Sequence, residues 1–301
     1  MKKTLAMMTA AMMTVGALAG CGSSSSTPAA TTAAATEAAT TAAATEAATD
    51  AATTEAAGDT AAAAEGSVKT PSGKFTVGFD QEFPPMGFVG DDGQFTGFDL
   101  DLAKEVASRL GLEFVPQPIN WDAKDMELDS GNIDCIWNGF TMQGREDAYT
   151  WVGPYMANNQ VFVVNADSDI ASKADLAGKA VEVQKDSSGL AALQDDAELS
   201  ASFGSMTEVA DYNTALMDLE SGACDAVCMD SIVAGYQIKS SGKDMKILDD
   251  TLSAEEYGIG FKKGEDELAK AVYDTLMEMK DDGTVAKISN DWFGSDVFTL
   301  K

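Results

Sequence analysis

The chain has 301 residues and a formal net charge of −29 at pH 7, from 20 basic and 49 acidic side chains. A surface this acidic repels phosphate backbones and anionic lipid, which excludes nucleic acid as an expected partner. Histidine is absent and there are four cysteines. Histidine and cysteine supply most transition-metal ligands. With no histidine and so few cysteines, we expect no metal site and no cofactor.

The N-terminus has the pattern of an export signal. Lys2 and Lys3 precede an apolar stretch from Leu5 to Leu18, which is shorter than the roughly 20 residues of a membrane-spanning helix. The string Leu18-Ala19-Gly20-Cys21 resembles the lipobox of bacterial lipoproteins, which implies a signal peptide over residues 1–20 and a lipid on Cys21. We expect an exported protein, lipid-anchored to the outer face of the cytoplasmic membrane. A plain secretory signal with an incidental cysteine is the alternative.

Residues 21–68 have the composition of a tether. They are rich in Ala, Thr, Ser and Glu, and the segment Thr32–Thr40 is repeated without change as Thr41–Thr49. Such a segment buries too little apolar surface to offset the entropy of ordering, so it is predicted to be disordered. The folded part is therefore expected to begin at Lys69.

Strands and helices alternate in the first part of the folded region, which is typical of a parallel, doubly wound α/β lobe. The predicted elements are a strand at Lys74–Phe79, a turn at Pro84-Pro85, a helix at Leu100–Leu110, a strand at Leu112–Pro116, a helix at Asp122–Leu128 and a strand at Ile133–Trp137.

The pattern begins again later in the chain, which indicates a second lobe. The predicted strands are Gln160–Val164, Ala180–Val183, Ala226–Met229, Lys246–Leu248 and Tyr257–Phe261. The predicted helices are Lys173–Leu176, Ser187–Leu193, Asn213–Glu220, a helix that follows the strand Ala226–Met229 and ends at Lys239, and Glu265–Lys280. The last strands are expected to return to the first lobe, which would make that lobe discontinuous.

The most specific string is Gly97-Phe98-Asp99-Leu100-Asp101-Leu102. Gly97 permits a turn, and Asp99 or a neighbour is expected to cap the helix that follows. Leu102, Val106 and Leu110 recur at helical spacing and predict one buried stripe.

Taken with its surroundings, this string resembles the family 3 extracellular solute-binding proteins. The similarity extends in order over Lys74 to Gly294 and includes Phe83-Pro84-Pro85-Met86-Gly87-Phe88, Leu128-Asp129-Ser130-Gly131-Asn132-Ile133-Asp134, Gly153-Pro154-Tyr155, Leu219-Glu220-Ser221-Gly222 and Trp292-Phe293-Gly294. The resemblance implies extracellular binding of a small polar amino acid and its delivery to an ABC importer permease.

The resemblance also implies the fold, a two-lobed type II periplasmic-binding-protein-like fold of class α/β. The lobes would be joined by two hinge strands near 158–163 and 249–257. On this reading residues 69–160 and 255–301 form lobe 1, and residues 161–254 form lobe 2.

The resemblance places three residues at the ligand's α-carboxylate. Arg145 stands where the family's arginine grips this group, because a planar guanidinium meets two carboxylate oxygens with two parallel N–H groups. Thr141 is assigned as a hydroxyl and amide donor, and Ser188 as a donor at a helix N-terminus. The alternative for Arg145 is an ordinary surface arginine.

The resemblance places Asp230 opposite the ligand's α-ammonium group. It directly follows the predicted strand Ala226–Met229, at the carboxyl end where open α/β sheets bind ligands. Asp225, at the start of that strand, is expected to be structural. A plain helix cap is the alternative role for Asp230.

The remaining pocket positions are predicted to surround the ligand's side chain. They are Asp80, Phe83, Trp121, Gly139, Phe140 and Ser187. For the aromatic residues a role in the core is the alternative. Asp186 replaces the family's usual glycine beside Ser187 and puts an anion next to the proposed site. The acids and aromatics of this set favour a polar or cationic ligand, and the amino acid itself stays open.

The protein is expected to be a monomeric binding protein and no enzyme. The alternatives are a ligand-sensing protein, which would carry a membrane helix after the lobes, or a periplasmic dehydratase-like enzyme on the same fold. Cys135, Cys224 and Cys228 lie in apolar runs and are expected to be buried. A Cys224–Cys228 disulfide is the alternative, with poor geometry if both lie on one short strand.

Overall fold

The computed structural model describes residue 70 and residues 72–301. The predicted signal peptide, the lipid on Cys21 and the tether lie outside these residues. Within the described part, no helix combines the length and the apolar character that crossing a membrane requires.

One eight-stranded sheet runs through the described part, with strand order β5-β1-β6-β11-β7-β10-β8-β9. Its strands are β1 (Lys74–Phe79), β5 (Glu113–Pro118), β6 (Cys135–Thr141), β7 (Tyr149–Asn165), β8 (Ala180–Gln184), β9 (Ser205–Val209), β10 (Ala226–Asp230) and β11 (Met245–Lys262). A smaller antiparallel sheet holds β2 (Glu82–Phe83), β3 (Gly87–Val89) and β4 (Phe95–Thr96).

The sheet has two parallel ends and an antiparallel middle. β1 pairs in parallel with β5 and β6 at one end, and β8 pairs in parallel with β9 and β10 at the other. Between them, β7 and β11 pair antiparallel with each other and with their outer neighbours. We call the end with β1, β5 and β6 the first lobe and the end with β8, β9 and β10 the second lobe.

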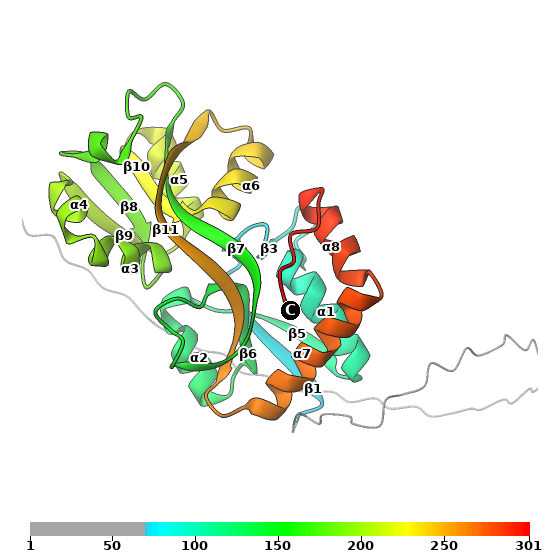
Figure 1. Cartoon of the computed structure of the whole chain (residues 1–301). Coiled ribbons are helices and arrows are strands. Elements are labelled where there is room, and N and C mark those ends of the chain that lie inside the picture. The colour runs from blue at the N-terminus through cyan, green and yellow to red at the C-terminus, as the bar shows by residue number, and fades with distance from the viewer. Residues whose placement is uncertain (1–69, 71) are drawn as a thin grey trace, which may run out of the picture. The chain divides into compact units, whose positions relative to one another are not determined.

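The helices belong to one lobe or the other (Figure 1). With the first lobe lie α1 (Phe98–Leu110), α2 (Lys124–Ser130), α7 (Asp266–Asp281) and α8 (Thr284–Phe293). With the second lie α3 (Ser188–Asp195), α4 (Ala197–Ser202), α5 (Tyr212–Ser221) and α6 (Ser231–Ser241). Short 3-10 turns occupy Trp121–Ala123 and Lys173–Leu176.

β7 and β11 are the two strands that run from one lobe to the other, side by side (Figure 1). Each contains one of the two predicted hinge segments. The two strands predicted at 246–248 and 257–261 are in fact parts of the single strand β11. Its register against β7 shifts between Ile247 and Thr251, between Thr251 and Ser253, and between Tyr257 and Ile259.

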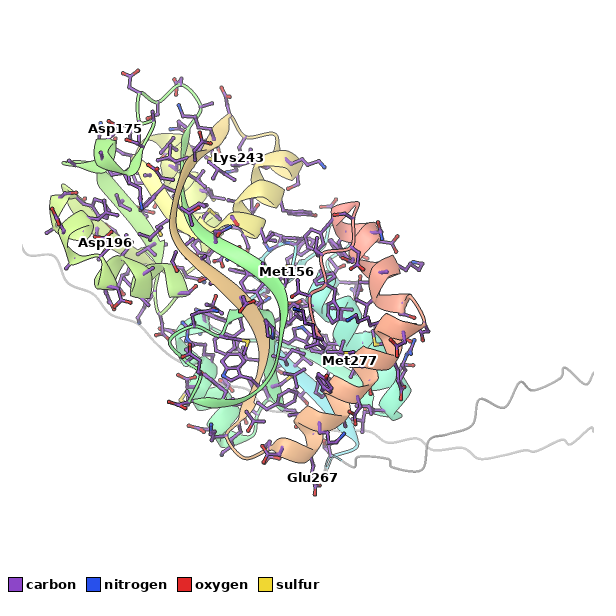
Figure 2. The ribbon with its side chains drawn as sticks, in the orientation of Figure 1. Met156, Asp175, Asp196, Lys243, Glu267 and Met277 are labelled. Atoms are coloured by element: carbon purple, nitrogen blue, oxygen red, sulfur yellow. The ribbon has the colours of Figure 1, made fainter. Side chains whose placement is uncertain are left out.

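The apolar side chains fill the space between the sheet and its helices. Leu102 and Val106 of α1 are fully buried, as the spacing predicted, and Leu110 packs against the same cluster. Figure 2 shows Met156 of β7 in the interior, while Asp175, Asp196 and Glu267 lie at the periphery. The second lobe has a separate cluster around Phe162, which lies between β10 and β11.

The prediction that Asp99 or a neighbour caps α1 is wrong. Gly97 occupies the N-cap position at φ 146° without a side-chain cap, and a Cβ there would meet the Met86 carbonyl oxygen at 2.2 Å. Asp99 is instead buried and accepts hydrogen bonds from the Gly139 amide (2.6 Å) and the Tyr155 hydroxyl (2.8 Å). Burial raises the pKa of Asp99 to about 7, although both hydrogen bonds oppose the shift.

The three described cysteines are free and buried, which overturns the disulfide alternative. Cys224 precedes β10, whereas Cys228 lies within it, so the two do not share a strand. Burial raises the pKa of the Cys224 thiol to about 12, so this thiol stays protonated and behaves as a small apolar side chain.

Candidate functional site

A small pocket lies between the two lobes, where the carboxyl ends of β6, β8 and β10 approach one another. Its lining residues are Phe83, Trp121, Gly139, Thr141, Arg145, Gln184, Ser187, Ser188 and Asp230. The structure thus brings together eight of the predicted site residues and adds Gln184, whose amide had not been predicted. Asp80 lines the neighbouring cavity, and Phe140 is fully buried in the core.

Hydrogen-bond donors gather on one side of this pocket. Arg145 follows the end of β6, and its guanidinium donates to the Thr141 carbonyl (3.2 Å) and the Asp186 carbonyl (3.4 Å). The guanidinium also lies 5.2 Å from the ring centre of Phe140, so Phe140 supports the arginine from the core side. The Thr141 hydroxyl lies 3.2 Å from the Ser188 hydroxyl, across the two lobes. A guanidinium and two hydroxyls suit a carboxylate.

The two serines at the start of α3 have different roles. Ser187 is the N-cap, and its hydroxyl accepts a hydrogen bond from the Leu190 amide at 3.0 Å. Ser188 is the first residue of the helix and is less buried. The hydroxyl of Ser188, rather than that of Ser187, is therefore the one that faces the neighbouring donors.

Asp230 also lines the pocket, at the end of β10, and is 3% exposed. It accepts hydrogen bonds from Asn158 Nδ2 (2.6 Å), the Tyr257 hydroxyl (2.8 Å) and the Tyr212 hydroxyl (3.3 Å). Although it occupies the N-cap position of α6, its side chain makes no cap hydrogen bond. The plain helix-cap role is therefore wrong. Burial, with Glu255 as a further cause, raises the pKa of Asp230 well above its usual range.

Three polar residues of the crossing strands were missed by sequence reasoning. Asn158 and Gln160 of β7 and Glu255 of β11 are all at most 4% exposed and lie directly behind Asp230 and Ser188. The Glu255 carboxylate accepts from Asn158 Nδ2 (2.6 Å) and Gln160 Nε2 (2.8 Å). A signal was present: Glu255 alternates with apolar Tyr257 in a strand pattern, which directs both side chains to one face.

The anion that Asp186 brings to the site is paired. Lys124 of α2 forms an ion pair with the Asp186 carboxylate from across the lobes, and the lysine side chain is 2% exposed. The Lys124 ammonium also lies 5.2 Å from the Trp121 ring centre. Asp186 has a positive φ of 56°, a left-handed conformation in which glycine, asparagine and aspartate are the usual residues. The structure thus explains how an aspartate stands in the place of the expected glycine.

Further polar contacts join the lobes near the pocket. Gln184 Nε2 donates to Asp80 Oδ2 at 2.7 Å, Lys185 Nζ lies 2.8 Å from Asp122 Oδ2, and Asn213 donates to Glu82. The pocket has a cavity volume of about 10 Å³, which is about what one water molecule needs and too little for an amino acid. These contacts hold the lobes together, and admission of a ligand requires the walls to move apart.

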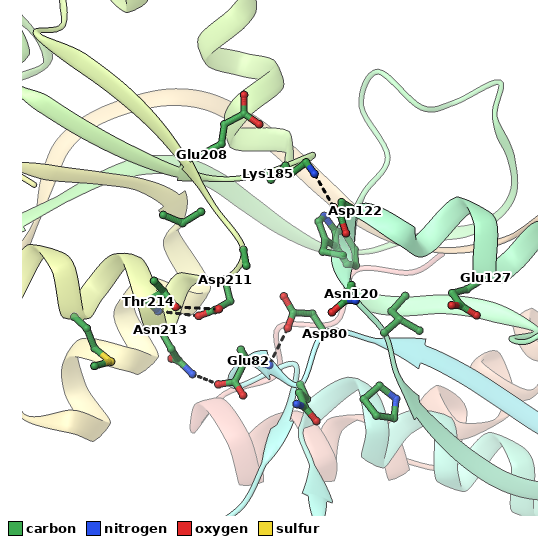
Figure 3. Close-up of a pocket in the computed structure, with 17 residues that line it drawn as sticks. Asp80, Glu82, Asn120, Asp122, Glu127, Lys185, Glu208, Asp211, Asn213 and Thr214 are labelled. Atoms are coloured by element: carbon green, nitrogen blue, oxygen red, sulfur yellow. Dashed lines mark hydrogen bonds and ion pairs between the residues drawn. The ribbon is translucent and has the colours of Figure 1, made fainter. Parts of the chain in front are cut away.

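A larger cavity of about 940 Å³ adjoins the pocket (Figure 3). Trp121 lines both, and Asp80 of the larger cavity accepts a hydrogen bond from Gln184 of the smaller pocket. Its lining is strongly acidic, and its ionisable residues are Asp80, Glu82, Asp122, Glu127, Lys185, Glu208 and Asp211. Lys185 is the one basic side chain among them, and Figure 3 shows it paired with Asp122. Burial raises the pKa of Asp80 to about 6.

Comparison with known proteins shows the relatives of this chain. It is 32% identical to the L-cystine-binding protein TcyJ of Escherichia coli (strain K12), over 75% of this chain and 84% of the relative. It is 30% identical to the arginine-binding extracellular protein ArtP of Bacillus subtilis (strain 168), over 73% of this chain and 86% of ArtP.

Solved structures show the same fold. An ABC uptake transporter substrate-binding protein from Streptococcus pneumoniae with bound histidine is 34% identical, with a TM-score of 0.73 over 76% of this chain and 95% of that one. An ancestral arginine-binding protein bound to arginine is 36% identical, with a TM-score of 0.69 over 74% and 99%.

These neighbours share the two-lobed type II architecture that the sequence predicted. The family described as bacterial extracellular solute-binding proteins, family 3, matches residues 75–295. The match covers nearly all of the residues that the structure describes. The chain therefore belongs to the bacterial extracellular solute-binding proteins of family 3.

Proposed function

We propose that this protein binds a small polar amino acid outside the cell, between its two lobes, and delivers it to the permease of an ABC importer. One observation carries the proposal. A single pocket is lined by Arg145, by the hydroxyl residues Thr141 and Ser188, and by the buried carboxylate of Asp230. These groups complement the α-carboxylate and the α-ammonium that every amino acid carries.

The residue roles follow from this arrangement. Arg145, Thr141 and Ser188 hold the ligand's carboxylate, and Asp230 holds its ammonium group. Phe83, Trp121, Gly139 and Ser187 form the walls, Asp80 reaches the ligand's side chain, and Phe140 supports Arg145 from the core. Residues 69–160 and 255–301 would move as lobe 1 and residues 161–254 as lobe 2, about the strands β7 and β11. The relatives named for binding cystine, arginine and histidine support this reading.

The acidic cavity beyond Asp80 favours a ligand whose side chain ends in a positive or strongly polar group. A side chain extending from the pocket past Trp121 would enter a space lined by Glu82 and Asp211. Fields from several acids in one cleft raise the local concentration of cations. A cationic amino acid is therefore favoured over an aliphatic one.

The proposal extends to the cell surface. The lipobox-like string ending in Cys21 supports an N-terminal lipid that anchors the protein to the outer face of the cytoplasmic membrane. There the protein would act as a monomer, without catalysis, beside the permease. Its relatives are solute-binding proteins rather than enzymes.

A thermal-shift screen tests the binding function directly. The mature protein without residues 1–20 is melted with each of the twenty amino acids and with cystine. A ligand present at a hundred times its dissociation constant stabilises the protein by about 2.7 kcal/mol. We expect one or a few polar or cationic amino acids to raise the melting temperature, and an Asp230→Asn variant to lose the shift. A screen in which no amino acid raises it would contradict the proposal.

A further inference from the structure

Two buried carboxylates meet behind the pocket. Asn158 Nδ2 donates to Asp230 Oδ1 and to Glu255 Oε1, each at 2.6 Å, so these two oxygens lie within about 5 Å of each other. Asp230 is 3% exposed and Glu255 is 4% exposed. Glu255 lies directly opposite Asn158 in the pairing of β11 with β7, so the strand pairing itself fixes this arrangement.

The other partners of the two carboxylates are neutral. Asp230 accepts from the hydroxyls of Tyr212 and Tyr257, and Glu255 accepts from Gln160 Nε2 at 2.8 Å and from the Ser188 hydroxyl at 3.5 Å. Among the described residues, neither carboxylate forms an ion pair with a lysine or arginine. Arg145, which lines the same pocket, directs its guanidinium to two carbonyl oxygens instead.

Two negative charges in this environment repel each other strongly. At this separation, in a site shielded from water, two unit charges interact far more strongly than they would in water, and burial adds a desolvation penalty for each ion. Paired carboxylates in such sites avoid the repulsion by retaining one proton between them.

We propose that Glu255 and Asp230 act as one acidic unit, which holds a single shared proton in the ligand-free protein and releases it when a ligand's ammonium group binds. The inference rests on the proposed amino-acid site and adds Glu255 to it. On binding, the O–H bond of the protonated carboxyl breaks, the proton leaves to solvent, and the ammonium group donates to the Asp230 carboxylate. Glu255 does not touch the ligand in this scheme; it sets the charge of Asp230.

The surrounding titratable groups are consistent with this assignment. Burial raises the pKa of three neighbours of the pair well above its usual range: Tyr212 of α5, Cys228 of β10 and Tyr257 of β11. All three are therefore neutral near pH 7, so they add no further negative charge, and a phenol or thiol has no cationic form that could compensate the pair. The pKa of Asp230 itself is raised by burial and by Glu255, in the direction that retains a proton.

The proposal gives binding a defined pH dependence. Where the unit is protonated, a ligand must displace one proton, so affinity falls about tenfold for each pH unit of acidification. Once the pH exceeds the titration midpoint of the unit, no proton remains to be displaced and this dependence ends. Affinity falls on acidification because, in this scheme, the pKa of the unit is high in the ligand-free protein and low in the complex.

The ligand-free protein provides the first test. The side-chain carboxyl carbons of Asp and Glu are labelled with carbon-13 and titrated by NMR, with Asp230→Asn to assign the signal. In wild type, the unit should titrate well above the ordinary range of aspartate. In Glu255→Gln, the Asp230 midpoint should fall by about 1 to 3 pH units. The neighbouring Glu256→Gln, whose side chain is exposed on the same strand, should leave it unchanged.

Calorimetry provides the second test, with L-arginine, L-histidine and L-cystine as probes in buffers of different ionisation enthalpy. Wild type should release about one proton per bound amino acid near pH 7, and Glu255→Gln should release markedly less. Failure of all three probes to bind would count against the proposed function. Binding without proton release, or a wild-type Asp230 that titrates in the ordinary acidic range, would overturn the shared proton. The wild-type measurements decide this even if Glu255→Gln does not fold.

Discussion

The ion pair between Lys124 and Asp186 allows a sharp test of how the lobes stay closed. Asp186→Asn removes the negative charge, keeps the shape of the side chain, and tolerates the positive φ of 56° at this position. Lys124 would then lie 2% exposed with only neutral partners, which are the amide oxygen of the new side chain and the backbone carbonyls of Trp121 (3.4 Å) and residue 186 (3.5 Å). In an open protein the same ammonium group reaches water, so the substitution destabilises the closed form selectively.

The magnitude follows from the burial of the two partners. Breaking a fully buried ion pair costs about 3 to 5 kcal/mol. Because the Asp186 side chain is 52% exposed, solvent screens part of this interaction, and we expect about 1 to 3 kcal/mol. If closure and ligand binding are coupled, affinity should fall roughly 5- to 150-fold.

Calorimetry with the amino acid identified in the screen measures the affinity, and small-angle scattering measures the compactness of the ligand-free protein. We expect Asp186→Asn to bind more weakly and to be more expanded. The double variant Lys124→Met with Asp186→Asn should regain affinity, because it leaves no uncompensated charge. Lys185→Met, which breaks the exposed pair with Asp122, should cost less than about 1 kcal/mol. An Asp186→Asn protein with unchanged affinity and unchanged radius of gyration would refute the reasoning.

Three further predictions concern the proposed site, the buried Asp99 and the lipobox-like sequence at Cys21. Arg145→Ala should weaken ligand binding by about 2 to 5 kcal/mol in calorimetry. Asp225→Ala removes the acceptor of one hydrogen bond from the Ala180 amide and should change only the melting temperature. Equal losses of affinity in the two variants would contradict the assigned roles. Burial raises the pKa of Asp99 to about 7, so between about pH 4 and pH 7 the folded state keeps a proton that the unfolded state has lost. As the pH rises through this range, the free energy of unfolding should fall by up to about 1.4 kcal/mol per pH unit. Urea unfolding should show that Asp99→Asn, but not the exposed Asp91→Asn, removes this slope. Cys21→Ser should release the protein from membranes, and a variant that still sediments with them would rule out the lipid anchor.

Local patterns predicted much of the fold. Strands such as Lys74–Phe79 and Ala226–Met229 were found within a residue or two, because an alternating apolar pattern or a short continuous apolar run is typical of a strand. The short strand β9 and the helices α4 and α8 were missed. β9 is mostly exposed at the sheet edge, so its sequence lacks the apolar alternation of an inner strand.

Residues of the candidate pocket could be predicted where the family resemblance names their position. Residues that are buried only by contacts between distant parts of the chain could not. Arg145 and Asp230 lie in the same pocket, as expected. Family resemblance singled out neither Lys124 nor Glu255. A lysine on an amphipathic helix usually faces solvent, and the one local signal for Glu255 was its spacing of two residues from Tyr257. Only tertiary contacts bury them. The capping role expected of Asp99 failed for the same reason, because the buried amide of Gly139 lies 40 positions further along the chain.

The register shifts of β11 have a mechanical consequence. They lie on both sides of the segment Ser253–Tyr257, which itself stays in register with Met156–Gln160 of β7. Strands bend and twist most easily where a shift interrupts the ladder. Bending of the paired strands β7 and β11 should therefore concentrate at the two sites of register shift, while the segment between them moves as one rigid body. Glu255 and Asn158 lie in that rigid segment, so the distance between them should stay the same when the two lobes rotate relative to each other.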